Sequence, residues 1–409
     1  MMSGSAEPAR TLRTASPQEV GMSGPRLSEL SSLLQEWVDK EDARTQAIEV
    51  LVARRGGIVF HEAFGRLTPA ADSPKTPLRT IFRLASITKV LTATALMTLV
   101  DDGRVGLNRP VVEYVPEFKG EGKATVLVRH LLTHTSGLNE PEVEKFAHEH
   151  LADPVTPPPD STIHPLIHRW YSLRYGAPLW KPPGTEMSYA DFNFELAGEI
   201  VRRVSGMALD RFAESRIFRP LGMMDTHYCR ADVPPERLVQ RPPDPEDPAM
   251  PADPVMDEIG KVLGKERVFL ASGLAASTAP DMAVLGQMFL NKGRYGSTRV
   301  LSPASVAAMT RNQIPGVKAT FLEQYFPEAS WGLGWSVHGS KTGLTGGLQS
   351  PSSFEHWGAG GPYIWVDPEL DLIGVYFASI PNLPDISEEN KFWRNDLFTD
   401  AVTAAVEDP

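Results

Sequence analysis

One stretch of the chain holds a serine and a lysine at a spacing that suits nucleophilic catalysis. Ser86 and Lys89 lie three residues apart, and Lys89 is the only charged residue between Arg83 and Asp101. On a helix both would share one face, so the Lys89 amine can take the proton of the Ser86 hydroxyl. The apolar surroundings predict a buried helix, in which desolvation lowers the pKa of a lysine toward the range of a general base. An SxxK pair also arises by chance, so the rest of the chain decides its meaning.

The composition is that of an ordinary soluble globular protein, with 42% hydrophobic and 22% charged residues. A length of 409 residues predicts two lobes, or one core with a large insertion. The formal net charge of −11 argues against nucleic-acid and anionic-membrane partners. A single cysteine, Cys229, excludes an internal disulfide framework and a CxxC metal site. No apolar leader and no apolar run of about 18 residues is visible, so a cytoplasmic location is expected.

The elements that must position the Ser86 stretch follow from hydrophobic periodicity. An amphipathic helix with Leu27, Leu30, Leu34 and Trp37 on one face precedes two β-rich runs around a Gly-Gly turn, which predict a hairpin. A later helix runs from Tyr189 to about residue 205. The predicted C-terminal elements are short strands at 331–337, 354–357, 362–366 and 372–378, and a final helix at about 388–406. The chain lacks GxSxG and long βαβ alternation, which argues against a doubly wound hydrolase.

Three histidine pairs have spacings that could suggest metal ligands. They are His130 with His134, His148 with His150, and His164 with His168. HxxxH can form half of a zinc site, but the sequence supplies neither the glutamate of HExxH nor an obvious third ligand. Packing and loop hydrogen bonds are the favoured interpretation, and we expect no metal and no cofactor.

Several motifs occur in an order typical of one protein family. They are Phe82 to Lys89, RHLLTHTSGL at 129–138, the Pro-Gly-Thr turn before Tyr189, PLGM at 220–223, WGLGW at 331–335 and HWGAGG at 356–361. The chain resembles the serine β-lactamase-related family of class C β-lactamases, DD-peptidases and family VIII carboxylesterases, over roughly residues 20 to 400. The resemblance implies an α+β, β-lactamase-like fold, with an antiparallel sheet flanked by helices and a mainly helical lobe.

The same resemblance implies a division of the chain into two lobes. Residues 20–105 and 295–409, from both chain ends, would form the mixed α/β lobe. Residues 106–294 would form the mainly helical lobe inserted between them, and residues 1–19 a flexible tail. The active site is then expected between the lobes.

Individual roles are also carried over from the family. Ser86 matches the nucleophile, Lys89 the base beside it and Tyr189 the tyrosine that shuttles protons, while the backbone N–H groups of Ser86 and Ala359 would form the oxyanion hole. The family's third motif is KTG in lactamases and HxG in many esterase-like members. The chain offers both Lys341-Thr342-Gly343 and His356-Trp357-Gly358. We choose the second, because it opens a glycine-rich run followed by a β-rich segment.

Two positions depart from the family pattern. The second motif usually reads Tyr-x-Asn, whereas Asp191 stands here in place of the asparagine. A carboxylate there removes a donor for an amide substrate and raises the expected pKa of Lys89, which disfavours lactam chemistry. A helix cap is the alternative role for Asp191. Trp357 is bulky for its position and would narrow the site or form an aromatic wall for an acyl group.

These expectations describe a serine carboxylesterase of the family VIII type that cleaves short- to medium-chain esters through an acyl-enzyme on Ser86. Its partner would be a small-molecule ester, with no nucleic acid and no membrane. A DD-peptidase or weak β-lactamase, and an acyltransferase to an alcohol, share the same catalytic residues and stay open. The non-enzyme alternative is a binding or scaffold protein on an inactive fold, which the presence of Ser86, Lys89 and Tyr189 disfavours.

Overall fold

The computed structural model describes residues 7–39, 45–241, 253–321, 324–340, 345–380 and 388–408. Its central feature is a seven-stranded sheet of order β1-β3-β2-β13-β12-β11-β10. The strands are β1 (Arg13–Thr14), β2 (Ala47–Arg54), β3 (Gly57–Gly65), β10 (Ser336–Val337), β11 (Phe354–Trp357), β12 (Tyr363–Asp367) and β13 (Leu372–Ser379). Neighbours pair antiparallel, apart from the short parallel β1–β3 pair. The pairing of β2 with β13 joins strands from the N-terminal and C-terminal parts of the chain in one sheet.

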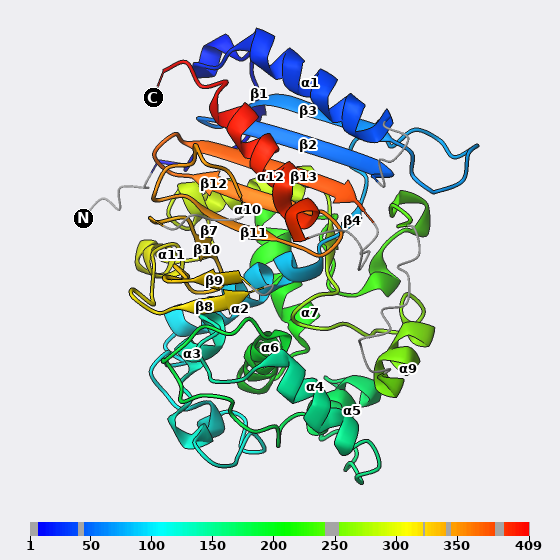
Figure 1. Ribbon diagram of the computed structural model, residues 1–409, viewed down its shortest axis with the longest axis vertical. Helices are drawn as coiled ribbons and strands as arrows, with labels where there is room; N and C mark the ends of the chain where they lie inside the picture. The colour runs from blue at the N-terminus through cyan, green and yellow to red at the C-terminus, as the bar shows by residue number, and fades with distance from the viewer. Residues whose placement is uncertain are drawn as a thin grey trace.

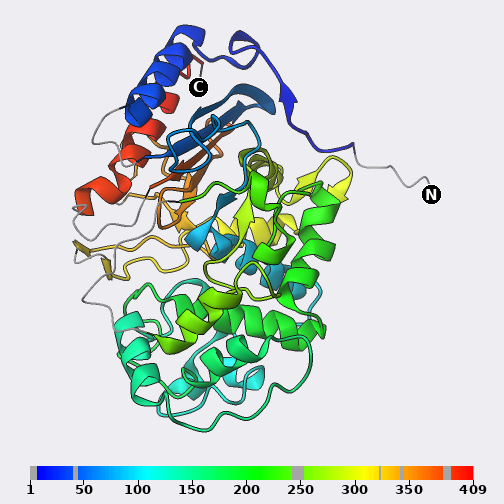
Figure 2. The ribbon, with the colours of Figure 1, turned by 90° about the vertical axis from the view of Figure 1, so that its right-hand side faces the viewer.

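Helices cover both faces of this sheet, as Figures 1 and 2 show. Helices α1 (Gly24–Asp39) and α12 (Glu388–Thr403) lie side by side over one face. The buried residues of α1 are Leu27, Leu30, Leu34 and Trp37, which is the face that the periodicity predicts. Helix α10 (Ala279–Leu290) packs on the other face, against β13, β2 and β12. The fold is therefore α+β.

Most of the remaining helices form the lower half of the molecule in Figure 1. They are α2 (Thr88–Asp101), α3 (Val128–Leu132), α4 (Glu140–Glu149), α5 (Pro165–Ser172), α6 (Asp191–Ser205), α7 (Leu209–Ala213), α8 (Arg219–Leu221) and α9 (Pro254–Val262), with α11 (Pro303–Met309) beside the sheet. The described residues also form three two-stranded sheets: β4 (Phe82–Arg83) with β5 (Ala276–Ser277), β6 (Arg294–Tyr295) with β7 (Thr298–Arg299), and β8 (Ala319–Phe321) with β9 (Gln324–Phe326). Helix α2 is buried along nearly its whole length and packs against α6 and α7.

One expected strand is shorter than predicted, and one helix packs away from its expected neighbours. The strand expected at 331–337 is reduced to β10, because the N–H groups of Leu333 and Gly334 donate to the carbonyls of Met309 and Leu132 instead of a neighbouring strand. Helix α10 lies in the range assigned to the helical lobe, yet it packs on the sheet. The lobe boundaries of the sequence analysis stay a prediction.

Candidate active site

The nucleophile candidate lies where the chain turns into the buried helix α2. Ser86 is half-buried in the 3-10 turn Ala85–Ile87, and Lys89 is fully buried in the first turn of α2. Ala85 has a φ of 44°, in the left-handed region that costs a non-glycine residue about 1–3 kcal/mol. The surrounding packing therefore holds this turn in a conformation that the local sequence alone does not favour.

The Lys89 ammonium has three close partners, as many as it has protons to donate. Its Nζ lies 2.9 Å from Ser86 Oγ, 3.1 Å from the Ser272 carbonyl oxygen and 2.6 Å from Asp191 Oδ1. Burial lowers the pKa of Lys89, but the charge of Asp191 and then Tyr189 outweigh burial and raise the pKa above its usual value. Lys89 is therefore a protonated amine at neutral pH, paired with a carboxylate.

Tyr189 lies beside this amine. Its ring centroid is 4.9 Å from Lys89 Nζ. Burial raises the pKa of Tyr189, while the nearby Lys89 and Ser86 act against that rise. No group in the described part of the chain makes a well-aligned hydrogen bond with its hydroxyl. The arrangement leaves that hydroxyl available to exchange a proton with Ser86, Lys89 or a substrate.

His134 packs against Tyr189, a contact that the sequence analysis missed. Its ring stacks on Tyr189 with 4.3 Å between ring centroids, and its Nδ1 accepts the Ala190 N–H at 3.2 Å. Burial and the charge of Lys89 lower the pKa of His134 well below its usual value, so the ring is neutral. It is thus a packing residue beside the catalytic candidates, as the interpretation by packing and loop hydrogen bonds predicts. The feature of the sequence that could have indicated this contact is the position of His134 in the THTSG run at 133–137.

Asp191 faces the amine and is not the helix cap. Helix α6 begins at Asp191 with Ala190 at the N-cap, and the Asp191 N–H donates to Glu140 Oε2 at 2.8 Å. The Asp191 side chain is 46% exposed while Lys89 is buried, so their ion pair lies where the site opens to solvent. Burial, then the charges of Asp191 and Glu144, raise the pKa of Glu140 to about 8. Glu140 is therefore mostly protonated at neutral pH, and Asp191 is the carboxylate that pairs with the amine.

The proposed third motif comes next to the nucleophile turn. A methyl group at Gly358 would lie 2.3 Å from the Leu84 carbonyl oxygen and 3.0 Å from the Ala85 Cβ, so only glycine allows the end of β11 to approach this closely. Ala359 follows and is exposed. The two predicted oxyanion-hole residues therefore sit on adjacent segments. The competing triplet Lys341-Thr342-Gly343 lies outside the described residues.

His356, in β11, is a buried neutral imidazole. Its Nδ1 donates to the Trp357 carbonyl at 2.8 Å, and burial together with the charge of Lys89 lowers its pKa to about 3. With Nδ1 protonated, Nε2 is an acceptor. A positive charge at this position is thus absent at physiological pH.

We expect His356→Ala to lower kcat/KM for an activated ester about tenfold or more, because the imidazole bonds the Trp357 carbonyl just before Gly358, which lies against the Ser86 turn, and small misplacements are costly in catalysis. Lys341→Ala is the comparison variant and should be nearly neutral, because the glycine-rich sequence around Lys341 predicts a solvated loop, where a charge contributes little. Steady-state kinetics on both variants check the expectation. The reverse ranking would assign the third motif to Lys341.

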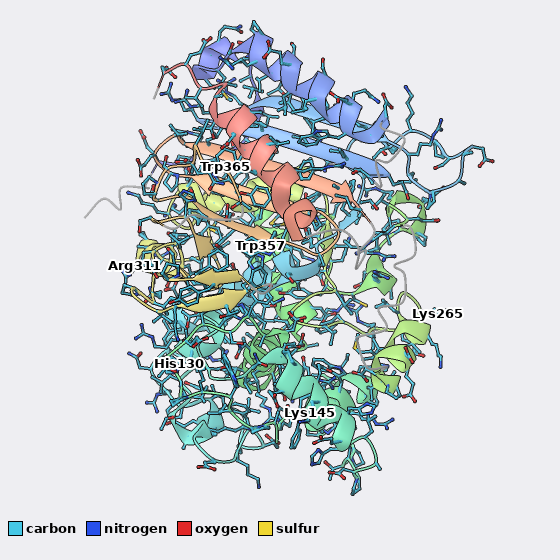
Figure 3. The ribbon with its side chains drawn as sticks, viewed as in Figure 1. His130, Lys145, Lys265, Arg311, Trp357 and Trp365 are labelled. Atoms are coloured by element: carbon cyan, nitrogen blue, oxygen red, sulfur yellow. The ribbon has the colours of Figure 1, made fainter. Side chains whose placement is uncertain are left out.

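An aromatic hollow of about 50 Å³ opens beside Tyr189. Its lining residues are Met187, Tyr189, Ala319, Phe321, Phe326, Ala329, Trp331, Ser336, Glu355 and Trp357. The Trp357 ring lies 6.0 Å from that of Trp331 and 5.9 Å from that of Phe321 (ring centroids). Figure 3 shows Trp357 where the sheet meets the helical half. The hollow can hold a small apolar group next to the catalytic candidates.

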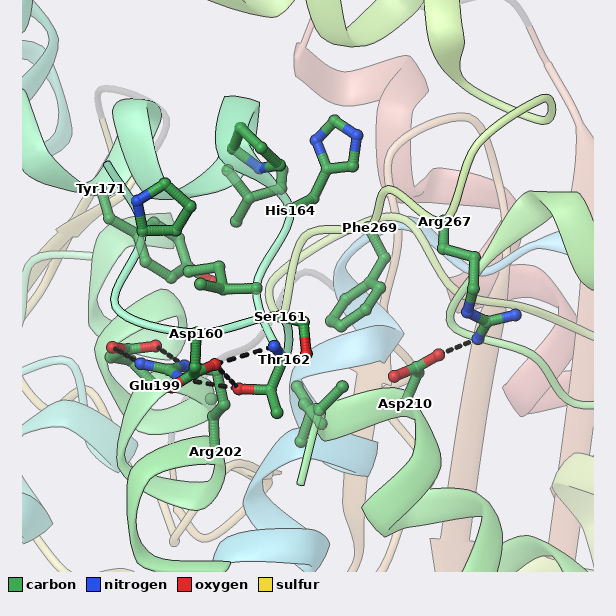
Figure 4. A pocket seen from close by; sticks show the side chains of 17 residues that line it. Asp160, Ser161, Thr162, His164, Tyr171, Glu199, Arg202, Asp210, Arg267 and Phe269 are labelled. Atoms are coloured by element: carbon green, nitrogen blue, oxygen red, sulfur yellow. Dashed lines mark hydrogen bonds and ion pairs between the residues drawn. The ribbon is translucent and has the colours of Figure 1, made fainter. Parts of the chain in front are cut away.

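A larger cavity of about 420 Å³ lies apart from these residues (Figure 4). Its charged groups mostly pair with one another: Arg202 with Asp160, and Arg267 with Asp210. Ser86, Lys89 and Tyr189 are not among its lining residues. Volume alone therefore does not make it the reaction site.

The chain is similar to known proteins in both sequence and fold. A family model described as beta-lactamase matches residues 34–396. A protein of Salmonella schwarzengrund named as a D-alanyl-D-alanine carboxypeptidase is 28% identical over 91% of this chain and 87% of its own length. EstCE1, a hydrolase with promiscuous acyltransferase activity, superposes with a TM-score of 0.69 at 19% identity, covering 94% of this chain and 99% of its own.

A family VIII carboxylesterase gives a TM-score of 0.66 at 21% identity, covering 88% of this chain and 93% of its own. The fold is β-lactamase-like, as the motifs predict. Among the described residues, no helix is both long and apolar enough to cross a membrane. With its family match over most of its length, the chain belongs to the beta-lactamase family of serine hydrolases.

Proposed function

We propose that the chain is a serine carboxylesterase for short- to medium-chain esters. The supporting observation is the 2.9 Å contact between Lys89 Nζ and Ser86 Oγ, with Tyr189 beside it. Ser86 Oγ attacks the ester carbonyl, its proton passes to the Lys89 and Tyr189 pair, and the alkoxide leaves with a proton from that pair. Water then attacks the acyl-enzyme by the reverse proton path. The N–H groups of Ser86 and Ala359 would hold the oxyanion.

The charges around the nucleophile favour a neutral ester over a peptide that ends in a carboxylate. Asp191 carries negative charge at the opening of the site, the Lys89 ammonium is buried with three partners already in place, and His356 is neutral. A substrate carboxylate is bound well by arginine, lysine or several N–H donors, and is repelled by a nearby carboxylate. A DD-carboxypeptidase is the second candidate, because the Salmonella relative carries that name.

The aromatic hollow supports a short acyl chain. The hollow is small, at about 50 Å³, and the rings of Trp357 and Phe321 lie against each other in its lining. An alcohol in place of water would make the same acyl-enzyme an acyltransferase intermediate. EstCE1, described as a hydrolase with promiscuous acyltransferase activity, makes that variant of the proposal worth testing.

The experiment compares substrate classes on the purified chain. p-Nitrophenyl acetate, butyrate and octanoate are assayed beside nitrocefin and a peptide ending in D-Ala-D-Ala, with Ser86→Ala as the blank. We expect turnover of the two shorter esters, a lower rate for octanoate, and slow lactam and peptide reactions. Faster peptide or nitrocefin turnover would replace the esterase by the second candidate. Product analysis with added alcohol measures the acyl-transfer share.

The proposal includes the cytoplasm as the compartment. The single cysteine, Cys229, is a buried free thiol, as is common in reducing compartments. A peptidase of the cell wall would act outside the cytoplasm, so cell fractionation with an antibody also bears on the choice between the two candidates.

A further inference from the structure

Glu195 is a buried carboxylate on α6. It bonds the backbone of residues 271–272, the segment that also accepts a hydrogen bond from Lys89. Glu195 is 0% exposed. Its Oε1 accepts the Ser272 N–H at 2.8 Å, and its Oε2 accepts the Ala271 N–H at 2.9 Å and the Tyr171 hydroxyl at 2.7 Å. Two consecutive backbone groups are therefore fixed by one side chain.

The same backbone segment supplies one of the three partners of the catalytic amine. The Ser272 carbonyl accepts from Lys89 Nζ at 3.1 Å, and the Ala271 carbonyl accepts from Thr92 Oγ1 at 2.6 Å. Lys89 and Thr92 both lie on α2. The segment is thus held between Glu195 on one side and α2 on the other, and the direction of the Ser272 carbonyl depends on both.

We propose that Glu195 is a positioning residue, which orients the Ser272 carbonyl and through it aims the Lys89 amine at Ser86. This proposal rests on the proposed function, because it takes Lys89 as a group that accepts the Ser86 proton. The lysine side chain is a flexible stem of four methylenes, so it needs fixed hydrogen-bond acceptors to hold its nitrogen in one place. Ser86 and Asp191 are partly open to solvent, whereas the Ser272 carbonyl is the acceptor that the protein interior fixes.

A buried carboxylate can also serve stability alone, and the chain contains a matched case. Glu49 in β2 is likewise 0% exposed. Its carboxylate accepts two consecutive backbone N–H groups, Arg79 at 2.8 Å and Thr80 at 3.0 Å. Neither of these residues contacts Lys89 in the structure. Glu49→Gln therefore removes a comparable buried carboxylate without touching the amine's partners.

The experiment compares Glu195→Gln with Glu49→Gln. An amide nitrogen cannot accept, so Glu195→Gln loses at least one of the backbone bonds. We expect kcat to fall about tenfold with KM nearly unchanged, since misplaced catalytic groups cost up to about 10²-fold. The rising limb of the pH profile should move to lower pH, because a displaced Ser272 carbonyl stabilises the charged form of Lys89 less well. Glu49→Gln should lower only the melting temperature.

Tyr171→Phe separates positioning from core damage. Tyr171 lines the large cavity of Figure 4. Tyr171→Phe removes only the hydroxyl that donates to Glu195, so the bonds from the Ala271 and Ser272 N–H groups to Glu195 stay. We expect its kcat to stay within about threefold of the parent, because the segment is still fixed. A loss as large as that of Glu195→Gln, or an equal kcat loss in Glu49→Gln, would overturn the proposal. If Glu195→Gln does not fold, Glu195→Asp, which withdraws the carboxylate by one methylene, is held to the same expectation.

Labelling by a phosphonate probe tests the positioning role of Glu195 without requiring that the substrate be known. The rate at which a fluorophosphonate labels Ser86 depends on activation of the hydroxyl and needs no ester turnover. Slower labelling in Glu195→Gln with no ester turnover in the parent would support the positioning role and reject the esterase. Equal labelling rates in the parent and Glu195→Gln would reject the positioning role.

Discussion

Ser86→Ala is expected to abolish ester hydrolysis, with a loss in kcat of about 10⁴-fold or more, because the covalent step disappears with the hydroxyl. The side chain is half-buried, and its contact with Lys89 Nζ at 2.9 Å is the interaction lost. The amine keeps Asp191 and the Ser272 carbonyl as partners. The melting temperature should therefore change little. Steady-state kinetics and thermal unfolding measure both outcomes.

Ser305→Ala is the control for this substitution. Its hydroxyl donates to Asp101, the last residue of α2, at 2.6 Å, so the change affects the other end of the same helix. Activity should be kept. Fluorophosphonate labelling followed by peptide mass mapping locates the nucleophile directly. An adduct on a serine other than Ser86 would reject the assignment.

Local spacing explains why the sequence predicts the nucleophile and its neighbours. Ser86 and Lys89 are one helical turn apart, so their contact follows from helix geometry once the apolar run is recognised. The β2–β3 hairpin follows from its Gly-Gly turn, and Gly206 ends α6 in the left-handed conformation, as a C-terminal glycine predicts. These features depend on residues close together in the chain.

The features that the sequence analysis missed depend on distant residues. Lys89 meets the Ser272 carbonyl across 183 positions, and His134 meets Ala190 across 56. Backbone carbonyls carry no sequence signal of their own. Glu195 stands in a helix as one more polar residue, and only the fold shows that it accepts backbone N–H groups. The raised pKa of Lys89, by contrast, follows from the sequence, because Asp191 stands two residues after Tyr189 in place of the family's asparagine.

Asp191→Asn should move the rising limb of the pH profile to lower pH. Lys89 has a raised pKa because of the charge of Asp191 against the effect of burial, so its amine is protonated at neutral pH and activity should rise into the alkaline range. Removing an opposite charge at 2.6 Å shifts such a pKa by about one to three units. The 46% exposure of the Asp191 side chain screens the charge, which places the shift near the lower end, about one unit.

A shift of about one unit gives roughly a tenfold gain in kcat/KM at a neutral pH on the rising limb, since the active form gains tenfold in population. Profiles of kcat/KM against pH with one activated ester check this. Asp232→Asn is the matched control, because Asp232 is 35% exposed and pairs with Arg267 at 2.7 Å away from Lys89. Its profile should superpose on that of the parent. Asp191 raises the pKa of both Lys89 and Tyr189, so an unmoved profile in Asp191→Asn would mean that neither group sets the pH dependence.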